Sequence, residues 1–337
     1  MYATTPRFRR SVSLAGPRGA PLEDEETHFH KTAGMLRVFT LLTAAVHAAG
    51  GAITIVVGQR RDQHFATYVS YMKWPEEAGK SFEFVRVKAT TLSLMGLVAS
   101  FFFLSFAFQF FPAAYTPLWQ NTLERLTTKG IQPYRWVEYS ASASCLLLVA
   151  AALGGIDDLH FLLLIFGSTW AVMMLGWIQE NTAYYIRAAT RKSAPHKAIG
   201  LVEFVAPHLV GWVPYIMVWF ALFHKFQLAS HGAHLPAWLN LVYVFNIVVF
   251  SCFGVNQAWQ MARLYGRPEA AELKHIALQH EFVYVFLSLA AKSVTAYFLL
   301  SGMLASSKYG TIDHVIRAAN ATYTEYKGLS NSKFRVQ

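Results

Sequence analysis

The chain has 337 residues, of which 54% are hydrophobic, 15% are aromatic and only 14% are charged, against about 25% charged residues in an ordinary soluble domain. The net charge of +10 comes from basic residues between long apolar runs, without an aromatic-basic RNA motif, so no nucleic-acid partner is expected. Cys145 and Cys252 lie in apolar stretches without metal-ligand spacing, which excludes a disulfide framework and a zinc site.

The first 33 residues are polar, with several arginines followed by the acidic run that ends at Glu26. This composition predicts a disordered tail rather than a signal peptide. The last residues, 305–337, form a second, basic tail. Between the two tails, 34–304 contains no internal repeat and is interpreted as one domain.

Seven apolar windows within this domain are long enough to cross a bilayer, which takes about 20 residues in a helix. The sequence therefore predicts an all-α membrane protein, a bundle of seven transmembrane helices embedded in the lipid bilayer. The windows cover 34–58, 86–111, 133–154, 159–186, 199–224, 237–262 and 279–304.

The first connecting loop, 59–85, is the longest between predicted helices and contains an aromatic and β-branched run that starts at Phe65. Such a run predicts a β-hairpin that covers one face of the bundle. The loops after the second, fourth and sixth windows together carry nine lysines and arginines, against four in the first loop and almost none in the loops after the third and fifth windows. By the positive-inside rule we expect a cytoplasmic N-terminus and an outside C-terminus.

Lys292 lies in the middle of the seventh window, too deep for its ammonium group to reach the interface. An amine in an apolar cleft becomes a nucleophile that can form a Schiff base. The alternative is a salt bridge between helices. Ser288 precedes Lys292 by one turn and lies on the same helix face.

Glu138, in the first half of the third window, is the natural counter-charge, because a buried cation needs a compensating carboxylate. Ser142 follows it by one turn and is placed to support the carboxylate. The alternative is a carboxylate that faces the cytoplasm and pairs with Arg135.

Four further polar residues lie inside predicted spans, where an ionisable group is a functional hypothesis by default. Glu180 and Glu281 are near span ends and are either functional or simple interface residues. His47 and His208 are lone histidines, for which a packing role is the alternative. No set of histidines and acids has metal-ligand spacing, and no nucleophile elbow or phosphate-binding loop is present, so soluble-enzyme chemistry is not expected.

Aromatic residues gather in the fourth to sixth windows. Around a central amine they are suited to a slot for a flat, conjugated, apolar ligand, although aromatics are also common in helix cores. They are Trp177, Trp212, Tyr215, Trp219, Phe250 and Phe253.

Three short sequence motifs narrow the choice of protein family. Arg135-Trp-Val-Glu-Tyr-Ser-Ala-Ser-Ala-Ser resembles the third-helix signature of the heliorhodopsins, and Phe-Leu-Ser288-Leu-Ala-Ala-Lys292-Ser resembles their seventh-helix retinal motif. Phe250-Ser-Cys-Phe-Gly-Val-Asn-Gln is similar to their sixth-helix motif. The likeness covers all seven windows, and the three motifs have the family's order and spacing.

This resemblance implies all-trans retinal on Lys292 as a protonated Schiff base, with Glu138 as its sole counterion. It also implies that Ser105 hydrogen-bonds the counterion and Ser288 the Schiff base. The polyene would be lined by Tyr139, Gly176, Tyr215 and Phe250. The family further implies a cytoplasmic N-terminus and a homodimer, with the first loop forming β-structure over the outer face.

One position departs from the family pattern. The family usually has a histidine one turn after the serine of the second helix, where this chain has Gln109. With His47, that histidine would form a polar cavity near the counterion. Its replacement puts in doubt a role of the pair as proton acceptor.

The residue three turns after Glu138, where a proton pump carries a second acid, is Val149, which argues against pumping. We therefore expect a photoreceptor with a slow photocycle that signals by conformational change to an unidentified partner, and not an enzyme. One alternative is a light-gated passive proton or cation channel, with His47, Glu180 and Glu281 as steps. A second alternative is a retinal-free membrane scaffold or enzyme regulator, in which Lys292 is only salt-bridged.

Overall fold

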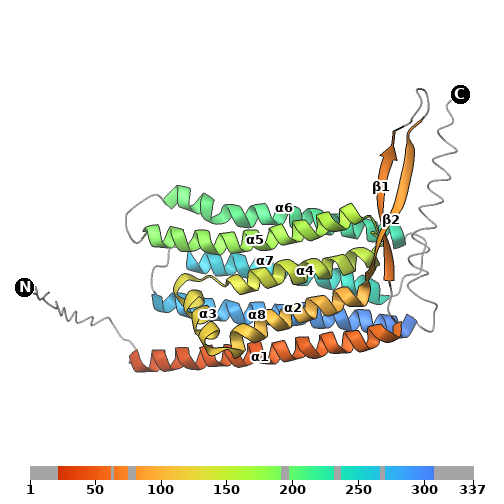
Figure 1. Ribbon diagram of the computed structural model, residues 1–337. Coiled ribbons are helices and arrows are strands. Elements are labelled where there is room, and N and C mark those ends of the chain that lie inside the picture. The colour runs from red at the N-terminus through yellow and green to blue at the C-terminus, as the bar shows by residue number, and fades with distance from the viewer. Residues whose placement is uncertain are drawn as a thin grey trace, which may run out of the picture.

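The computed structural model describes residues 22–61, 64–74, 81–190, 197–230, 237–265 and 270–306 (Figure 1). Seven helices within these ranges are long and apolar enough to cross a membrane, which confirms the predicted architecture. They are α1 (Leu22–Arg61), α2 (Leu94–Ala114), α4 (Pro133–Leu153), α5 (Leu159–Thr190), α6 (Lys197–Ser230), α7 (Ala237–Leu264) and α8 (Ala270–Ser306).

The first helix starts earlier than predicted. α1 begins at Leu22, so 22–33 is helical and not part of a disordered tail. The predictions for 1–21 and 307–337 lie outside the described residues.

The first loop is the predicted hairpin. β1 (His64–Lys73) pairs antiparallel with β2 (Glu83–Ser93), with Phe65 opposite Leu92 and a register shift after Thr67. The second span was predicted from 86, which is wrong, because 86–93 belongs to β2. The segment Val-Arg-Val-Lys-Ala-Thr-Thr is rich in β-branched residues and carries two charges, which suit a strand better than a membrane helix. Helix α2 starts at Leu94, where the Ser93 side chain accepts from Gly96 N at 2.7 Å.

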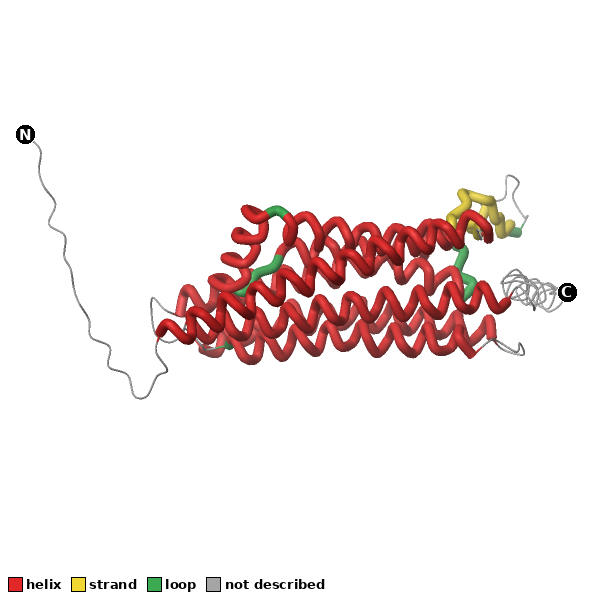
Figure 2. Tube along the Cα trace, turned by 90° about the horizontal axis from the view of Figure 1, so that it is seen from below, coloured by secondary structure: helices red, strands yellow, loops and turns green. Residues whose placement is uncertain are grey.

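A short helix, α3 (Thr116–Lys129), was not predicted and is too short to span a bilayer. Gly130 ends it with a φ of +68°, in the left-handed conformation that favours glycine, and its N–H donates to Leu126 O at 2.9 Å. Figure 2 shows the spanning helices side by side, with the start of α1 and the hairpin at opposite ends of the bundle. We call these the N-terminal end, where α3 lies, and the hairpin end (Figure 1).

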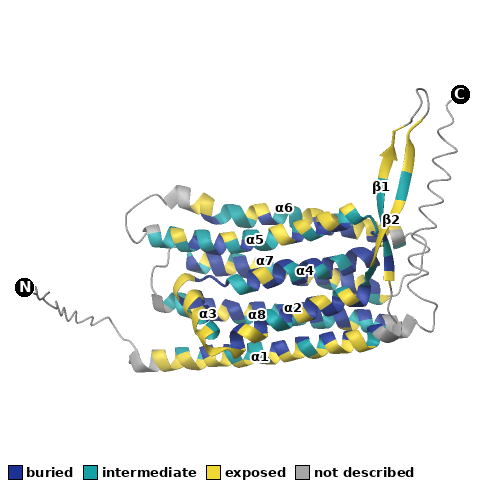
Figure 3. Ribbon diagram, viewed as in Figure 1, coloured by how far each residue is buried: buried dark blue, intermediate teal, exposed yellow. Residues whose placement is uncertain are grey.

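Helix α4 is the central helix of the bundle. In its most apolar window 78% of the residues are buried, against 22% in the windows of α5 and α6. In Figure 3 the exposed residues follow the outer faces of the peripheral helices, whereas α4 is mostly buried. Large apolar side chains cover the outside of α6, which is the surface that lipid contacts in a membrane. They include Leu209, Val213, Met217 and Phe220.

The hairpin is tied to the turn between α4 and α5. Tyr68 N–H donates to Asp157 O at 2.8 Å, and the Arg86 guanidinium pairs with the Asp157 carboxylate while lying 4.1 Å from the centre of the Tyr68 ring. Burial raises the pKa of Asp157, and the charge of Arg86 opposes this rise. The hairpin is therefore positioned across the end of the central helix.

Candidate functional site

Lys292 lies in the middle of the bundle on α8 and is only 4% exposed. Its Nζ donates to Glu138 Oε1 at 2.8 Å and to Ser288 Oγ at 2.7 Å. Two side chains that are 154 positions apart in the chain thus form one buried ion pair, which is the geometry that the sequence predicts for the amine and its carboxylate. The Ser288 hydroxyl holds the amine from one turn earlier on the same face.

The other residues predicted around the pair lie close to it. The Tyr139 ring centre is 5.3 Å from Lys292 Nζ, and its hydroxyl donates to Tyr284 O at 3.0 Å. Ser105 and Ser142 are buried, and the Ser105 hydroxyl donates to Phe101 O at 2.9 Å in its own helix. Their predicted support of the Glu138 carboxylate stays a prediction.

Arg135 is not the partner of Glu138, so the alternative in which the Glu138 carboxylate pairs with Arg135 is wrong. The Arg135 guanidinium pairs instead with Glu180 of α5 and Glu281 of α8. Glu180 Oε2 also accepts from Gln132 N at 2.9 Å. Both acids are buried, so neither is a simple interface residue, and they form a second charged cluster between Lys292 and the N-terminal end.

His47 and Gln109 are buried near the ion pair. Both His47 ring nitrogens and Gln109 Oε1 have no hydrogen-bond partner among the described residues that meets ordinary geometry. His47 nevertheless lies within electrostatic range of Lys292. The polar surroundings of the pair thus exist in this chain, with an amide at the position where the family has a histidine.

Tyr139 also lines an aromatic cavity, which has a volume of about 570 Å³ counted with its opening. Small-molecule sites are typically lined by apolar and aromatic side chains of this kind. Tyr139, Gly176, Tyr215 and Phe250, all predicted to line the ligand, line this cavity. The other predicted aromatics divide between sites. Trp212 and Phe253 line the same cavity, and Trp219 lines a smaller adjoining one.

These residues fit retinal, which requires an amine, a carboxylate and a flat apolar slot. Gly176 shows how closely the wall of the cavity is packed, because a Cβ at this position would come 2.4 Å from the Trp136 ring. A larger residue there would displace the indole. The cavity wall therefore depends on a residue without a side chain at the point where α5 meets α4.

Sequence reasoning missed Tyr284 and His280. Tyr284 lies two turns before Lys292, and its ring centre is 3.7 Å from the Arg135 guanidinium. His280 lies one turn further and its Nδ1 is 2.7 Å from Asn256 Oδ1. The i−4 and i−8 spacing from Lys292 is the signal that places Ser288 and Tyr284 toward the helix face of Lys292, whereas His280, at i−12, has no such signal.

Seven spanning helices around a buried lysine–carboxylate pair and an aromatic cavity define a protein with the microbial rhodopsin fold. A solved structure with this fold is a cyanorhodopsin from the cyanobacterium Tolypothrix, with a TM-score of 0.50 and 12% identity, over 86% of this chain and 98% of that one. The profile of the heliorhodopsin family matches residues 36–304, so the chain belongs to that family and is a retinal-binding rhodopsin.

A second solved structure is similar at a lower level. It is a light-driven proton pump from Leptosphaeria maculans, with a TM-score of 0.43 and 11% identity, over 83% of this chain and 95% of that one. No curated protein sequence matches this chain.

Proposed function

We propose that the protein is a light-sensing photoreceptor in which Lys292 carries all-trans retinal, and that it signals by a conformational change. The observation that carries the proposal is the buried amine of Lys292, 2.8 Å from the Glu138 carboxylate and 5.3 Å from the ring centre of Tyr139, which lines the aromatic cavity. Retinal bound to the amine supplies absorption of visible light and a double bond that isomerises.

The residues of the chain have distinct tasks in this proposal. Glu138 compensates a positive charge at Nζ, which is otherwise costly at this depth. Ser288 orients the nitrogen by its hydrogen bond. Tyr139 lies beside the amine and lines the aromatic cavity, so its ring borders both the charged pair and the apolar slot. Movement of charge or of a proton at Nζ then changes the forces on Glu138 and on the polar groups around it.

The distribution of polar groups favours a sensor over a pump. Val149, three turns beyond Glu138 on α4, is 1% exposed and belongs to an apolar cluster. A proton released at Nζ therefore finds charged and polar groups toward the N-terminal end and no acidic or basic residue on α4 toward the hairpin end. A slow photocycle is consistent with a proton that leaves Nζ and returns to it only through the polar groups toward the N-terminal end.

A light-gated passive proton or cation path is the second candidate function. It is supported by a polar cavity that is lined by both Glu138 and Glu281 and provides half of such a route. The retinal-free scaffold considered from the sequence is not supported, because the chain belongs to the heliorhodopsin family.

We also propose that the N-terminus is cytoplasmic and that the protein is a homodimer. The basic loops of the sequence support the orientation. For the dimer, the support is the end of the hairpin, where Trp74 is 77% exposed and packs edge-on against Phe82 at 5.0 Å. An exposed aromatic pair of this kind is typical of contact sites. Trp74→Glu should lower the dimer fraction in detergent, measured by light scattering.

The test of the photoreceptor is a visible spectrum of the protein expressed with all-trans retinal. We expect a visible band in the wild type and in Lys225→Ala, which changes an exposed lysine, and no band in Lys292→Ala. Lack of a band in folded wild-type protein would contradict the proposal. If the band is present, patch-clamp recording under light separates the candidates, because a sensor gives no sustained photocurrent and a channel does.

A further inference from the structure

The short helix α3 covers a second cavity, at the N-terminal end of the bundle. This cavity has a volume of about 570 Å³ counted with its opening, and Glu138, Arg135 and Glu281 line it. On the opposite wall α3 contributes Trp119, Thr122, Leu123 and Leu126. The helix therefore lies between the Glu138 carboxylate and the surface at the N-terminal end.

The cavity is polar and suited to water. Four buried atoms of its lining have no hydrogen-bond partner among the described residues, namely Gln109 Oε1, Thr122 Oγ1, Gln132 Oε1 and Arg135 Nε. Buried polar atoms of this kind usually bind ordered water. They line the wall from α3 to the Glu138 side, so water there would join the carboxylate to the inner face of α3.

Helix α3 buries little apolar surface in the bundle. Leu126 is its one buried hydrophobic residue in the described chain and belongs to a small cluster with Leu36 and Leu278, against which Trp119 and Leu123 pack partly buried. Gly130 ends the helix in a left-handed turn. Its outer face is polar and exposed, including Arg125. A segment with little buried apolar surface belongs to the part of a protein that opens most easily.

One side chain fastens the start of α3. Arg37 of α1 donates from Nε to Ala113 O at 2.7 Å, and from Nη2 to Ala114 O and Thr116 Oγ1, both at 3.2 Å. Its guanidinium also lies 5.9 Å from the centre of the Trp119 ring. A single arginine thus joins α1 to the end of α2 and to the first residue of α3.

We propose that α3 is a lid on the polar cavity and that Arg37 is the latch that keeps it closed. When the bonds of Arg37 break, α3 moves away from α1, and water from the N-terminal end reaches the cavity wall that holds Glu138. The latch controls hydration of the carboxylate without touching it, so Arg37 acts as a positioning residue. The lid requires neither light nor retinal, and its test is independent of the proposed photoreceptor function.

The test compares amide hydrogen–deuterium exchange of α3 in the dark, without added retinal, in the wild type, Arg37→Gln and Arg125→Gln. Arg125 is the matched control, because its Nε bonds only to Asn121 on the exposed face of the same helix. We expect exchange in 116–129 to be faster by at least about tenfold in Arg37→Gln, because the loss of even one of the three bonds of the guanidinium has about that effect. Exchange in 133–153 should stay unchanged and shows that the bundle is folded.

A second readout measures the cavity directly. A charged, membrane-impermeant thiol reagent should label Thr122→Cys faster when Arg37 is also changed to Gln, and label protein without this cysteine at an unchanged rate. Thr116→Val, which removes one acceptor of the latch, should raise α3 exchange less than Arg37→Gln does. Equal exchange and equal labelling in Arg37→Gln and Arg125→Gln would overturn the proposal and leave α3 as a fixed cover.

Discussion

The two ends of the bundle differ in the buried charged side chains that they contain. Each buried acidic or basic side chain of the described residues lies at the level of Lys292 or toward the N-terminal end. These are Arg135, Glu138, Glu180, Glu281 and Lys292, with His47 and His280 beside them.

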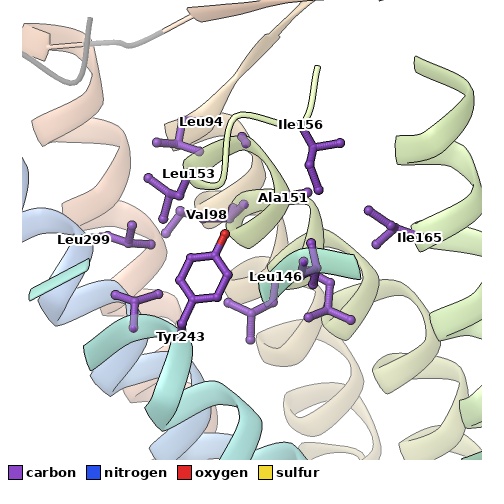
Figure 4. Packing of buried hydrophobic residues seen from close by; sticks show 14 of the residues in the cluster. Leu94, Val98, Leu146, Ala151, Leu153, Ile156, Ile165, Tyr243 and Leu299 are labelled. Atoms are coloured by element: carbon purple, nitrogen blue, oxygen red, sulfur yellow. The ribbon is translucent and has the colours of Figure 1, made fainter. Parts of the chain in front are cut away.

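The hairpin end is filled by an apolar cluster around Tyr243, whose hydroxyl bonds to Ala150 O (Figure 4). Two of its buried polar side chains pair with each other, through the bond from Thr295 Oγ1 to Asn246 Oδ1 at 3.1 Å. Only the N-terminal half can therefore respond to a change of charge at Lys292, while the hairpin half is a packed support. The following changes test this difference, from the largest expected effect to the smallest.

The largest effect is expected at Arg135. Arg135→Gln leaves Glu180 and Glu281 buried without their cation, which should cost about 3–5 kcal/mol of unfolding free energy. Thermal unfolding of the detergent-solubilised protein measures the loss. The triple variant with Glu180→Gln and Glu281→Gln should recover most of it, because a buried network removed as a whole leaves no unpaired charge. A triple variant as unstable as Arg135→Gln would show that the cluster is needed for packing rather than charge balance.

A new acid should be tolerated differently by the two halves. Val149→Asp introduces a carboxyl group among apolar side chains, and we expect a loss of roughly 3 kcal/mol. Thr122→Asp introduces the same group into the wall of the polar cavity, where water and Arg135 are available, and should cost less than half as much. The comparison uses thermal unfolding of both variants. Equal losses would contradict the asymmetry between the halves.

A cavity in the hairpin half should have a moderate effect. Leu299 is fully buried in the apolar cluster. Because unfolded helices remain in lipid, Leu299→Ala loses packing but little transfer free energy, and we expect a loss of about 1–3 kcal/mol. Tyr297→Ala on the same helix is the control, since Tyr297 is 66% exposed. The visible band should keep its position in Leu299→Ala, and a shift would show that the support half also shapes the ligand site.

Much of this arrangement was predictable from local sequence. Seven apolar windows and the first-loop hairpin follow from hydropathy and β-branched content, and the Lys292–Glu138 pair follows from the cost of burying a lone amine. Each of these inferences uses only the sequence of one segment or the charge of one residue. Tyr284 was within reach of the same logic, since it shares the helix face of Lys292, but an aromatic residue in a span carries no signal of its own.

The rest depends on contacts between distant segments. The ion pairs of Arg135 with Glu180 and Glu281 could not be predicted without knowing that three helices converge. Arg135 and Glu138 are close in sequence, which suggested a local pair instead. Helix α3 was missed because a short amphipathic segment has no membrane signal. The start of α2 was missed because β2 runs directly into it, and hydropathy does not distinguish a strand from a helix there.

The smallest effect is expected at the ion pair of Arg86 and Asp157, which joins the hairpin to the turn after α4 and in which Asp157 is the titrating group. Burial raises its pKa above the usual value of about 3.9, so the folded protein holds this proton more tightly than the unfolded chain. The stability from the protonated form is present below about pH 3.9 and is lost as the pH rises through the folded-state pKa. Since the side chain is 28% exposed and paired with Arg86, the loss should stay below about 1 kcal/mol.

Unfolding measured from about pH 4 to pH 7 should therefore show a shallow decline in the wild type that is absent in Asp157→Asn. Arg86→Gln should extend the decline to higher pH, because Arg86 opposes the effect of burial on Asp157. If stability instead rises with pH in the wild type and is flat in Asp157→Asn, the attraction of Arg86 outweighs burial. The hairpin end would then depend on an ion pair at its edge, although its interior holds no charge in the described residues.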